Sequence, residues 1–197
     1  MDKRILKTRK CLRDALLNLL KEKPYKKISV KEICDRSNTG RVTFYNHYDD
    51  KYDLLLDCFA QLQQQVAENF RTLQQKNNPD KGLMQTFENM IDATLDETEK
   101  YTYISLTEDL DLMTIYYHMV LNNLKGIELY LGKAVHIHYE QKQLNAFLAL
   151  GFWGFLHGNP DRSPEETRRD ANQLARDLAE SRIFSPEKNP AHNTDNT

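Results

Sequence analysis

The sequence lacks a long hydrophobic run, and this absence argues against a membrane protein. Its longest apolar stretch covers residues 146–156, eleven positions in all, whereas a membrane-spanning helix needs about 20. The first ten residues, MDKRILKTRK, are charged from the second position and contain no apolar core of a secretory signal. We therefore expect a cytoplasmic protein with no membrane partner.

Cysteine and glycine are also scarce. The cysteines, Cys11, Cys34 and Cys58, are widely spaced, which fits neither a disulfide framework nor a metal-ligand cluster. The seven glycines form no phosphate-binding loop, and no nucleophile–base motif is recognisable. His136 and His138 are two residues apart, so they would lie on different faces of a helix and would not chelate a metal as a pair. We therefore predict no metal, no cofactor and no enzymatic active site.

A marked asymmetry of charge, by contrast, is present. Residues 1–51 contain 14 Lys and Arg against 7 Asp and Glu, a balance of +7. The remaining residues contain 13 against 22, a balance of −9. A basic N-terminal part on an acidic body indicates a polyanionic partner for that part.

Helical periodicity runs through almost the whole chain. Apolar residues recur at helical spacing from Ile5 to Leu20, and Pro24 is expected to end that helix. Ser29 and Glu32 have the spacing of a capping box, which predicts a short helix over 30–37. Further helices are expected at about 41–47, 51–76, 83–96, 98–106, 108–131, 137–158 and 164–182, followed by a disordered tail over 184–197.

The segment around residue 40 has the pattern of a helix-turn-helix. The turn SNTG covers residues 37–40, and Asn38 suits a left-handed backbone there. A helix that enters the major groove needs core anchors on one side and polar or small groups on the other. Phe44 and Tyr48, four residues apart, are the predicted anchors. The predicted fold class is therefore all-α, with a helix-turn-helix DNA-binding domain over residues 1–50 and a helical dimerisation and effector domain over 51–183.

Residues 29–55, SVKEICDRSNTGRVTFYNHYDDKYDLL, resemble the signature of the TetR family of helix-turn-helix transcriptional regulators. The family's register is matched by Thr43-Phe44-Tyr45, His47-Tyr48, Lys51 and Leu54-Leu55. Two positions depart from it, because Ser37-Asn38 replaces the usual Ala-Gly and Val42 stands where a small residue is common. The run GFWG at 151–154, with SPEE at 163–166, resembles the branch that includes the regulator of dihydroxyacetone kinase operons.

The resemblance implies a transcription regulator, by default a repressor, that binds palindromic double-stranded operator DNA as a homodimer. Arg41 and Lys31 would reach bases, and Val42 could pack on a thymine methyl. Lys51 would bind a phosphate, whereas Ser29 would act mainly as a helix cap. The residues implied in DNA contact are Ser29, Lys31, Arg41, Val42, Thr43, Tyr45, Asn46, His47 and Lys51.

In TetR-like proteins an effector pocket lies between helices of the C-terminal body, so a small-molecule effector is a further partner that the resemblance allows. Tyrosine suits such a pocket because it offers an apolar ring and a polar tip. The candidate pocket residues are Tyr101, Tyr103, Tyr116, Tyr117 and His118. The equal alternative is that these are half-buried surface residues.

Two helices are candidates for the dimer interface. The segment 146–156 is apolar on all sides, which indicates a helix covered all round, and the last helix has a face of small residues. Both faces would be covered most easily if two subunits met there. The predicted interface residues are Gly151, Trp153, Gly154, Phe155, Gly158, Ala171, Leu174, Ala175 and Leu178.

Two alternative functions stay open. The body could bind a protein or a co-activator in place of a metabolite, and a core without a pocket would favour that interpretation. The chain could also be a helical enzyme with an appended helix-turn-helix, which turnover by the C-terminal half would favour.

Overall fold

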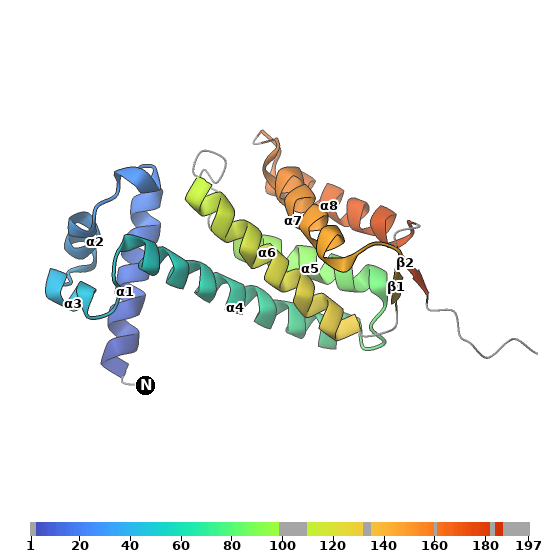
Figure 1. The fold of residues 1–197 in the computed structure, drawn as a ribbon, viewed down its shortest axis with the longest axis horizontal. Coiled ribbons are helices and arrows are strands. Elements are labelled where there is room, and N and C mark those ends of the chain that lie inside the picture. The colour runs from blue at the N-terminus through green and yellow to red at the C-terminus, as the bar shows by residue number, and fades with distance from the viewer. Residues whose placement is uncertain (1–2, 99–109, 132–134, 160, 182–183, 187–197) are drawn as a thin grey trace, which may run out of the picture. The chain divides into compact units, whose positions relative to one another are not determined.

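The computed structural model describes residues 3–98, 110–131, 135–159, 161–181 and 184–186. It consists of helices joined by turns (Figure 1), and the predicted all-α fold class is confirmed. The helices are α1 (Lys3–Leu20), α2 (Val30–Ser37), α3 (Arg41–Tyr45), α4 (Lys51–Asn77), α5 (Leu83–Thr98), α6 (Leu110–Leu131), α7 (Gln141–His157) and α8 (Pro164–Ala179), with a 3-10 turn at Tyr25–Lys27. Among the described helices, none has the length and apolar character that crossing a membrane requires.

One small element departs from the sequence prediction. The strands β1 (Val135–Ile137) and β2 (Phe184–Pro186) pair antiparallel, with Ile137 opposite Phe184. Residues 184–186 therefore do not belong to a disordered tail. A three-residue strand is held by its partner rather than by a local pattern, which is why its own sequence does not indicate it.

By compactness the chain divides into two units. Unit 1 comprises residues 1–66 and 96–119, and unit 2 comprises residues 67–95 and 120–197. Helices α4, α5 and α6 each contribute to both. The boundary predicted after residue 50 is a division by function; it does not coincide with these units and stays a prediction.

In unit 1, the core of the N-terminal head forms where α1 packs against α2. Leu12 and Leu16 of α1 are fully buried. In α2, Ile33 is fully buried and Cys34 is 3% exposed. Burial of each large aliphatic side chain is worth roughly 1.5–3 kcal/mol. Ile5, predicted on the same apolar face, is 40% exposed because it lies near the start of α1.

The turn between α2 and α3 has the predicted local chemistry. The backbone N–H of Glu32 donates to Ser29 Oγ (3.3 Å), and that of Ser29 donates to Glu32 Oε2 (2.9 Å), which completes the capping box. Asn38 ends α2 in the left-handed region at φ 51°, a conformation that asparagine tolerates better than most residues. The chain therefore turns sharply, and α3 begins at Arg41.

In unit 2, α5 and α8 pack closely through small side chains. Ala171 and Ala175 of α8 are 0% and 2% exposed and cluster with Ile91 and Leu95 of α5. The prediction that these two alanines contact a second subunit is therefore wrong. Their small size serves close packing inside one chain, which a sequence pattern cannot distinguish from packing between chains.

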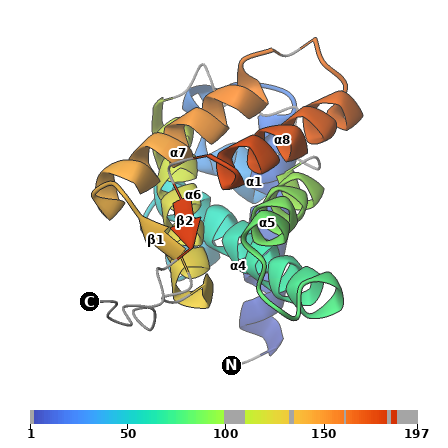
Figure 2. The same ribbon diagram turned by 90° about the vertical axis from the view of Figure 1, so that its right-hand side faces the viewer.

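Ion pairs border the same contact between α5 and α8. The Arg168 guanidinium lies 3.1 Å from an Asp92 oxygen, and the Arg176 guanidinium lies 2.7 Å from a Glu88 oxygen. Asn172 also donates to Asp92. Helix α7 lies beside α8 in both views (Figures 1 and 2), so α5, α7 and α8 together form the helical part of unit 2 that matters below.

A buried polar cluster fixes the turn from α4 into α5. Asn78 Nδ2 donates to Thr86 Oγ1 (2.9 Å) and to Gln74 Oε1 (3.0 Å), and the backbone N–H of Gly82 donates to Asn78 Oδ1 (2.8 Å). Thr86 is fully buried and Gln74 is 1% exposed. Buried amides with this many partners hold a turn in one geometry, since any shift would leave polar atoms without hydrogen bonds.

Candidate nucleic-acid interface

Helix α3 is held in place by two aromatic anchors. Phe44 is fully buried and Tyr48 is 2% exposed, and their ring centroids lie 5.8 Å apart. The rings of Tyr45 and Phe44 pack nearly at right angles, with their centroids 5.3 Å apart. The predicted anchors are thus confirmed, and they fix which face of this five-residue helix points outward.

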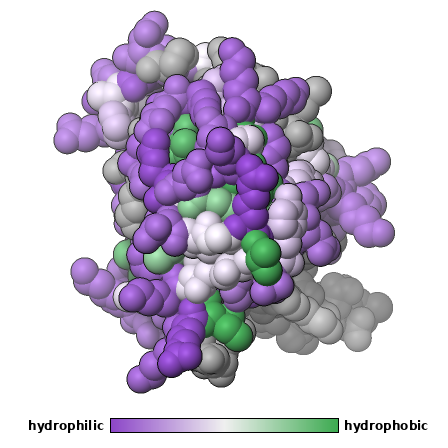
Figure 3. Space-filling view, turned by 90° about the vertical axis from the view of Figure 1, so that its left-hand side faces the viewer, coloured by the Kyte–Doolittle hydropathy of each residue, from purple (hydrophilic) through white to green (hydrophobic). Residues whose placement is uncertain are grey.

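The opposite face of α3 is open to solvent. Val42 is 77% exposed and Tyr45 is 56% exposed, and Arg41, Thr43 and Asn46 are exposed as well. Figure 3 views the chain from the side on which α2 and α3 lie in Figure 1, and that face is mainly hydrophilic with scattered hydrophobic side chains. An exposed β-branched side chain beside an arginine offers both a methyl-contacting and a base-reading group.

The remaining candidates on this face differ in exposure. Lys31, in the first turn of α2, is exposed, whereas His47 is half-buried beside the Tyr48 ring, with centroids 6.4 Å apart. Ser29 Oγ donates to Glu32 (2.8 Å), so its hydroxyl proton is used inside the cap. Hydrogen bonds from Lys23 and from Ser29 lower the pKa of Glu32 to about 2, which keeps the cap ionised.

The structure corrects the role of Lys51. Its ammonium donates to the backbone carbonyls of Ile28 (2.8 Å), Tyr25 (3.0 Å) and Lys26 (3.4 Å) and lies 4.4 Å from the centroid of the Tyr25 ring. A lysine has three N–H donors, and all three directions are used within the chain. Lys51 therefore holds the segment before α2 against the start of α4, and it does not present its charge to a phosphate.

We expect Lys51→Met to lower the free energy of unfolding by about 1–2 kcal/mol, because it removes charge-assisted hydrogen bonds and a cation–π contact. Urea denaturation followed by circular dichroism measures this loss. The slope of log affinity for DNA against log salt should stay unchanged. Lys31→Met is the matched control and should do the reverse, leaving stability intact and reducing the slope by about 1. A flatter salt slope for Lys51→Met would restore the phosphate role.

A polar hub that the sequence does not reveal joins α1, the end of the helix-turn-helix and α4. The Tyr48 hydroxyl donates to Asp57 Oδ2 (2.7 Å), and Arg13 and Arg9 donate to the two oxygens of the same carboxylate at 2.8 and 2.7 Å. Arg9 Nε also donates to Tyr48 (3.2 Å). The available signal is that Asp57 lies within a turn of the buried Leu54 and next to the buried Cys58 of α4, where a carboxylate needs partners.

The hub shifts the pKa values of its members in opposite directions. Burial opposes ionisation of Asp57, yet hydrogen bonds from Tyr48 and Arg13 and the two guanidinium charges lower the pKa of Asp57 below its ordinary value. Burial, followed by donation to Asp57, raises the pKa of Tyr48. The folded head therefore favours a charged Asp57 and a neutral Tyr48.

The predicted effector residues do not form a pocket among the described residues. Tyr101 and Tyr103 lie outside the described residues. Tyr116 is 1% exposed, Tyr117 is half-buried and His118 is exposed. A cavity of about 220 Å³ exists instead in unit 2, and of the three described candidates, Tyr116, Tyr117 and His118, none lines it. The prediction relied on the chemistry of tyrosine, whereas the cavity is formed by apolar side chains that are distant in sequence.

The predicted interface residues of α7 share an open face. Gly151 and Gly158 are exposed and Phe155 is 40% exposed, while Trp153 and Gly154 are half-buried. Leu174 and Leu178 of α8 are half-buried as well. Apart from the two alanines of α8, the predicted interface therefore remains compatible with this chain.

Comparison with known proteins agrees with this geometry. Residues 12–58 match the family described as "Bacterial regulatory proteins, tetR family". A curated relative, the uncharacterized HTH-type transcriptional regulator YxbF of Bacillus subtilis (strain 168), is 28% identical over 166 residues, which are 79% of this chain and 40% of the relative. The chain thus spans about 40% of the length of that relative.

Solved structures share the fold. A TetR-family regulator from Syntrophomonas wolfei is 16% identical with a TM-score of 0.71 and covers 89% of this chain and 96% of its own. A TerR/AcrR-family regulator from Aquifex aeolicus is 19% identical with a TM-score of 0.59 and covers 87% and 99%. The N-terminal head thus matches the DNA-binding head of the TetR family of helix-turn-helix regulators, and the chain shares its fold with solved structures of that family.

Proposed function

We propose that this protein is a cytoplasmic transcriptional repressor that binds palindromic operator DNA as a homodimer and is controlled by a small molecule. The observation that carries the proposal is that α3 has one buried face and one exposed face. Its anchors are buried to 2% or less, while Val42 and Tyr45 are more than half exposed. A helix held rigidly from behind, with open side chains in front, suits insertion into the major groove. The proposal includes no enzymatic step.

The exposed side chains divide into two roles. In this proposal Arg41 would donate two hydrogen bonds to a guanine, and Val42 would contact a thymine methyl. Thr43 and Tyr45 would bind phosphates and fix the register of the head. Lys31, exposed in the first turn of α2, is assigned a phosphate here, in place of the base that the family resemblance implies. Arg36, by contrast, pairs with Glu22 (2.8 Å), so its charge is partly neutralised within the head.

Dimerisation is supported by an exposed apolar stripe on α7. Phe147 is 65% exposed, Leu150 is 53% exposed and Phe155 is 40% exposed. These residues are three to eight positions apart, so they follow one face of the helix together with Gly151. A contiguous apolar stripe of this kind marks an interaction surface. A second copy meeting it around a two-fold axis would match the symmetry of a palindromic operator.

Arg41→Ala tests the recognition helix. We expect it to lower affinity for the selected operator by roughly 1–3 kcal/mol, about 5- to 150-fold, and to relax base preference at one position of each half-site. The operator is first obtained by selecting bound sequences from random DNA, and affinity is then measured by fluorescence anisotropy. Arg169→Ala is the control, because it removes another exposed arginine, one that belongs to unit 2. Equal affinity of Arg41→Ala and the parent would exclude α3 as the reading helix.

A further inference from the structure

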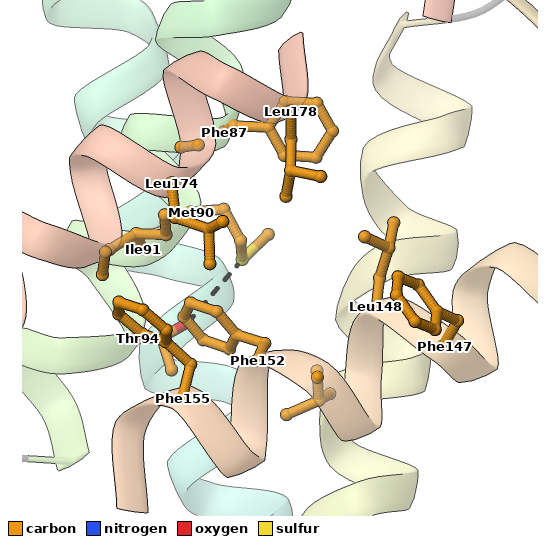
Figure 4. A pocket seen from close by; sticks show the side chains of 14 residues that line it. Phe87, Met90, Ile91, Thr94, Phe147, Leu148, Phe152, Phe155, Leu174 and Leu178 are labelled. Carbon is orange, nitrogen blue, oxygen red and sulfur yellow. Dashed lines mark hydrogen bonds between the residues drawn. The ribbon is translucent and has the colours of Figure 1, made fainter. Parts of the chain in front are cut away.

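The cavity of unit 2 lies between α5, α7 and α8, with Val120 of α6 contributing. Figure 4 shows side chains from these helices turned toward a common space, among them Phe87 and Met90 of α5, Phe152 of α7 and Leu178 of α8. All of the lining residues belong to unit 2, so the cavity is a property of that unit alone.

The lining is almost entirely hydrocarbon. Of the 14 described residues that line the cavity, none carries a charged side chain, and Thr94 has the one hydroxyl. The Thr94 hydroxyl donates to the sulfur of Met90 at 3.8 Å (dashed in Figure 4). A carboxylate, phosphate or ammonium entering this space would lose its hydration without gaining a partner, at a cost of several kcal/mol.

Charged side chains at the contact between α5 and α8, the two helices that supply much of the lining, are paired with one another. On α5, Asp92 binds Arg168 and Asn172, and Glu88 binds Arg176. A charged ligand would have to compete with these contacts. The electrostatics of α5 and α8 therefore agree with the lining in excluding ionic ligands.

The cavity opens to solvent beside the exposed Phe147 and Phe155, and its volume indicates the size of the part of an occupant that it can enclose. An apolar cavity of roughly 150 Å³ stays free of water and takes up benzene, and this one measures about 220 Å³. The space therefore fits a ring with a short alkyl substituent. Water is a poor occupant, since it needs 2–4 polar partners.

We propose that this cavity binds an uncharged, predominantly hydrocarbon small molecule about the size of an alkylbenzene. The inference deepens the proposed function, because it names the chemical class of the effector, and it rests on that function only for the regulatory consequence. Binding itself depends on unit 2 alone and can be measured without DNA.

Two glycines of α7 provide matched variants. Gly151 lines the cavity, and a Cβ built on it meets no atom within 4 Å. Gly154 lies on the same helix, and a Cβ built on it also meets no atom within 4 Å, but it does not line the cavity. Gly151→Leu should fill the space without a clash, and Gly154→Leu adds the same side chain elsewhere. Both changes replace a helical glycine by a better helix former, so both variants should fold.

The test uses the full chain and three probes of similar shape: propylbenzene, 3-phenylpropanoate and 2-phenylethylammonium. Saturation-transfer NMR should detect propylbenzene with a dissociation constant below about 1 mM. Both charged probes should bind at least about 30-fold more weakly. Gly151→Leu should abolish propylbenzene binding, while Gly154→Leu should retain it within about threefold of the parent.

Three results would overturn the inference: no propylbenzene binding by the parent, equal binding of a charged probe, or unchanged binding by Gly151→Leu. The first would also be the result if a second copy fills the cavity in solution. Operator binding without any probe reports on the proposed function separately. Tight operator binding with no propylbenzene binding would refute the ligand class alone, whereas propylbenzene binding by a chain that selects no DNA would refute the function alone.

Discussion

Leu150→Glu is expected to abolish dimerisation and to lower operator affinity about 100- to 10,000-fold, although it lies outside the head. Leu150 is 53% exposed at the centre of the apolar stripe of α7. A carboxylate there would be buried without a partner when two copies meet, which an interface does not tolerate. With the dimer lost, each head binds alone, and the gain from linking two heads disappears.

Leu150 is the member of the stripe that does not line the cavity of unit 2, whereas Phe147, Gly151 and Phe155 do, so a change at Leu150 alters the dimer surface while leaving the cavity lining intact. Light scattering at micromolar concentration measures the oligomeric state, and anisotropy with the selected operator measures affinity. Gln141→Glu is the control, since it adds the same charge at an exposed polar position in the first turn of α7. The dimer proposal fails if Leu150→Glu remains folded and dimeric, or if the parent is monomeric and still binds its operator tightly.

The features of the head that the sequence predicts correctly are local ones. The capping box needs only Ser29 and Glu32 at a fixed offset, and the left-handed turn needs only an asparagine at position 38. Phe44 and Tyr48 are identifiable as anchors because helical spacing places them on one side of a short helix. In each case the partner lies within a few residues, so the pattern contains the interaction.

The misassigned residues are those whose partners are distant in sequence. Lys51 has the position of a phosphate ligand, but its ammonium binds carbonyls that lie 23 to 26 residues earlier. The small-residue face of α8 predicts close approach of a helix without indicating that this helix is α5 of the same chain. The cavity combines side chains from α5 through α8, none of which is unusual by itself. Tertiary pairing determines all three, and no local pattern encodes it.

The Asp57 hub is another feature whose partners are distant in sequence, and it leads to a prediction about stability. We expect Asp57→Asn to lower the free energy of unfolding by about 2–3 kcal/mol at pH 7. The substitution leaves Arg9 and Arg13 close together without their counter-charge and weakens the acceptor of the Tyr48 hydroxyl. Urea denaturation measures the loss. Asp14→Asn is the control, because Asp14 pairs with Lys10 on the exposed side of α1, the helix that also carries Arg9 and Arg13. Exposed pairs of this kind contribute at most about 1 kcal/mol to stability.

The pH dependence distinguishes an electrostatic hub from simple packing. The pKa of Asp57 is lower in the folded head than in the unfolded chain, where it is about 4. The contribution of the ionised Asp57 to the free energy of unfolding is therefore complete above about pH 5, and it is lost as the pH falls through the pKa of Asp57 in the folded head. Because the pKa of Tyr48 is raised, the parent should also lose stability above about pH 10, where the unfolded tyrosine ionises more readily.

The difference in the free energy of unfolding between the parent and Asp57→Asn should be constant from pH 5 to pH 8 and shrink below pH 4. A difference that stays the same down to pH 2.5 would mean that Asp57 acts through its shape and hydrogen bonds, and that its charge does not hold α1, Tyr48 and α4 together.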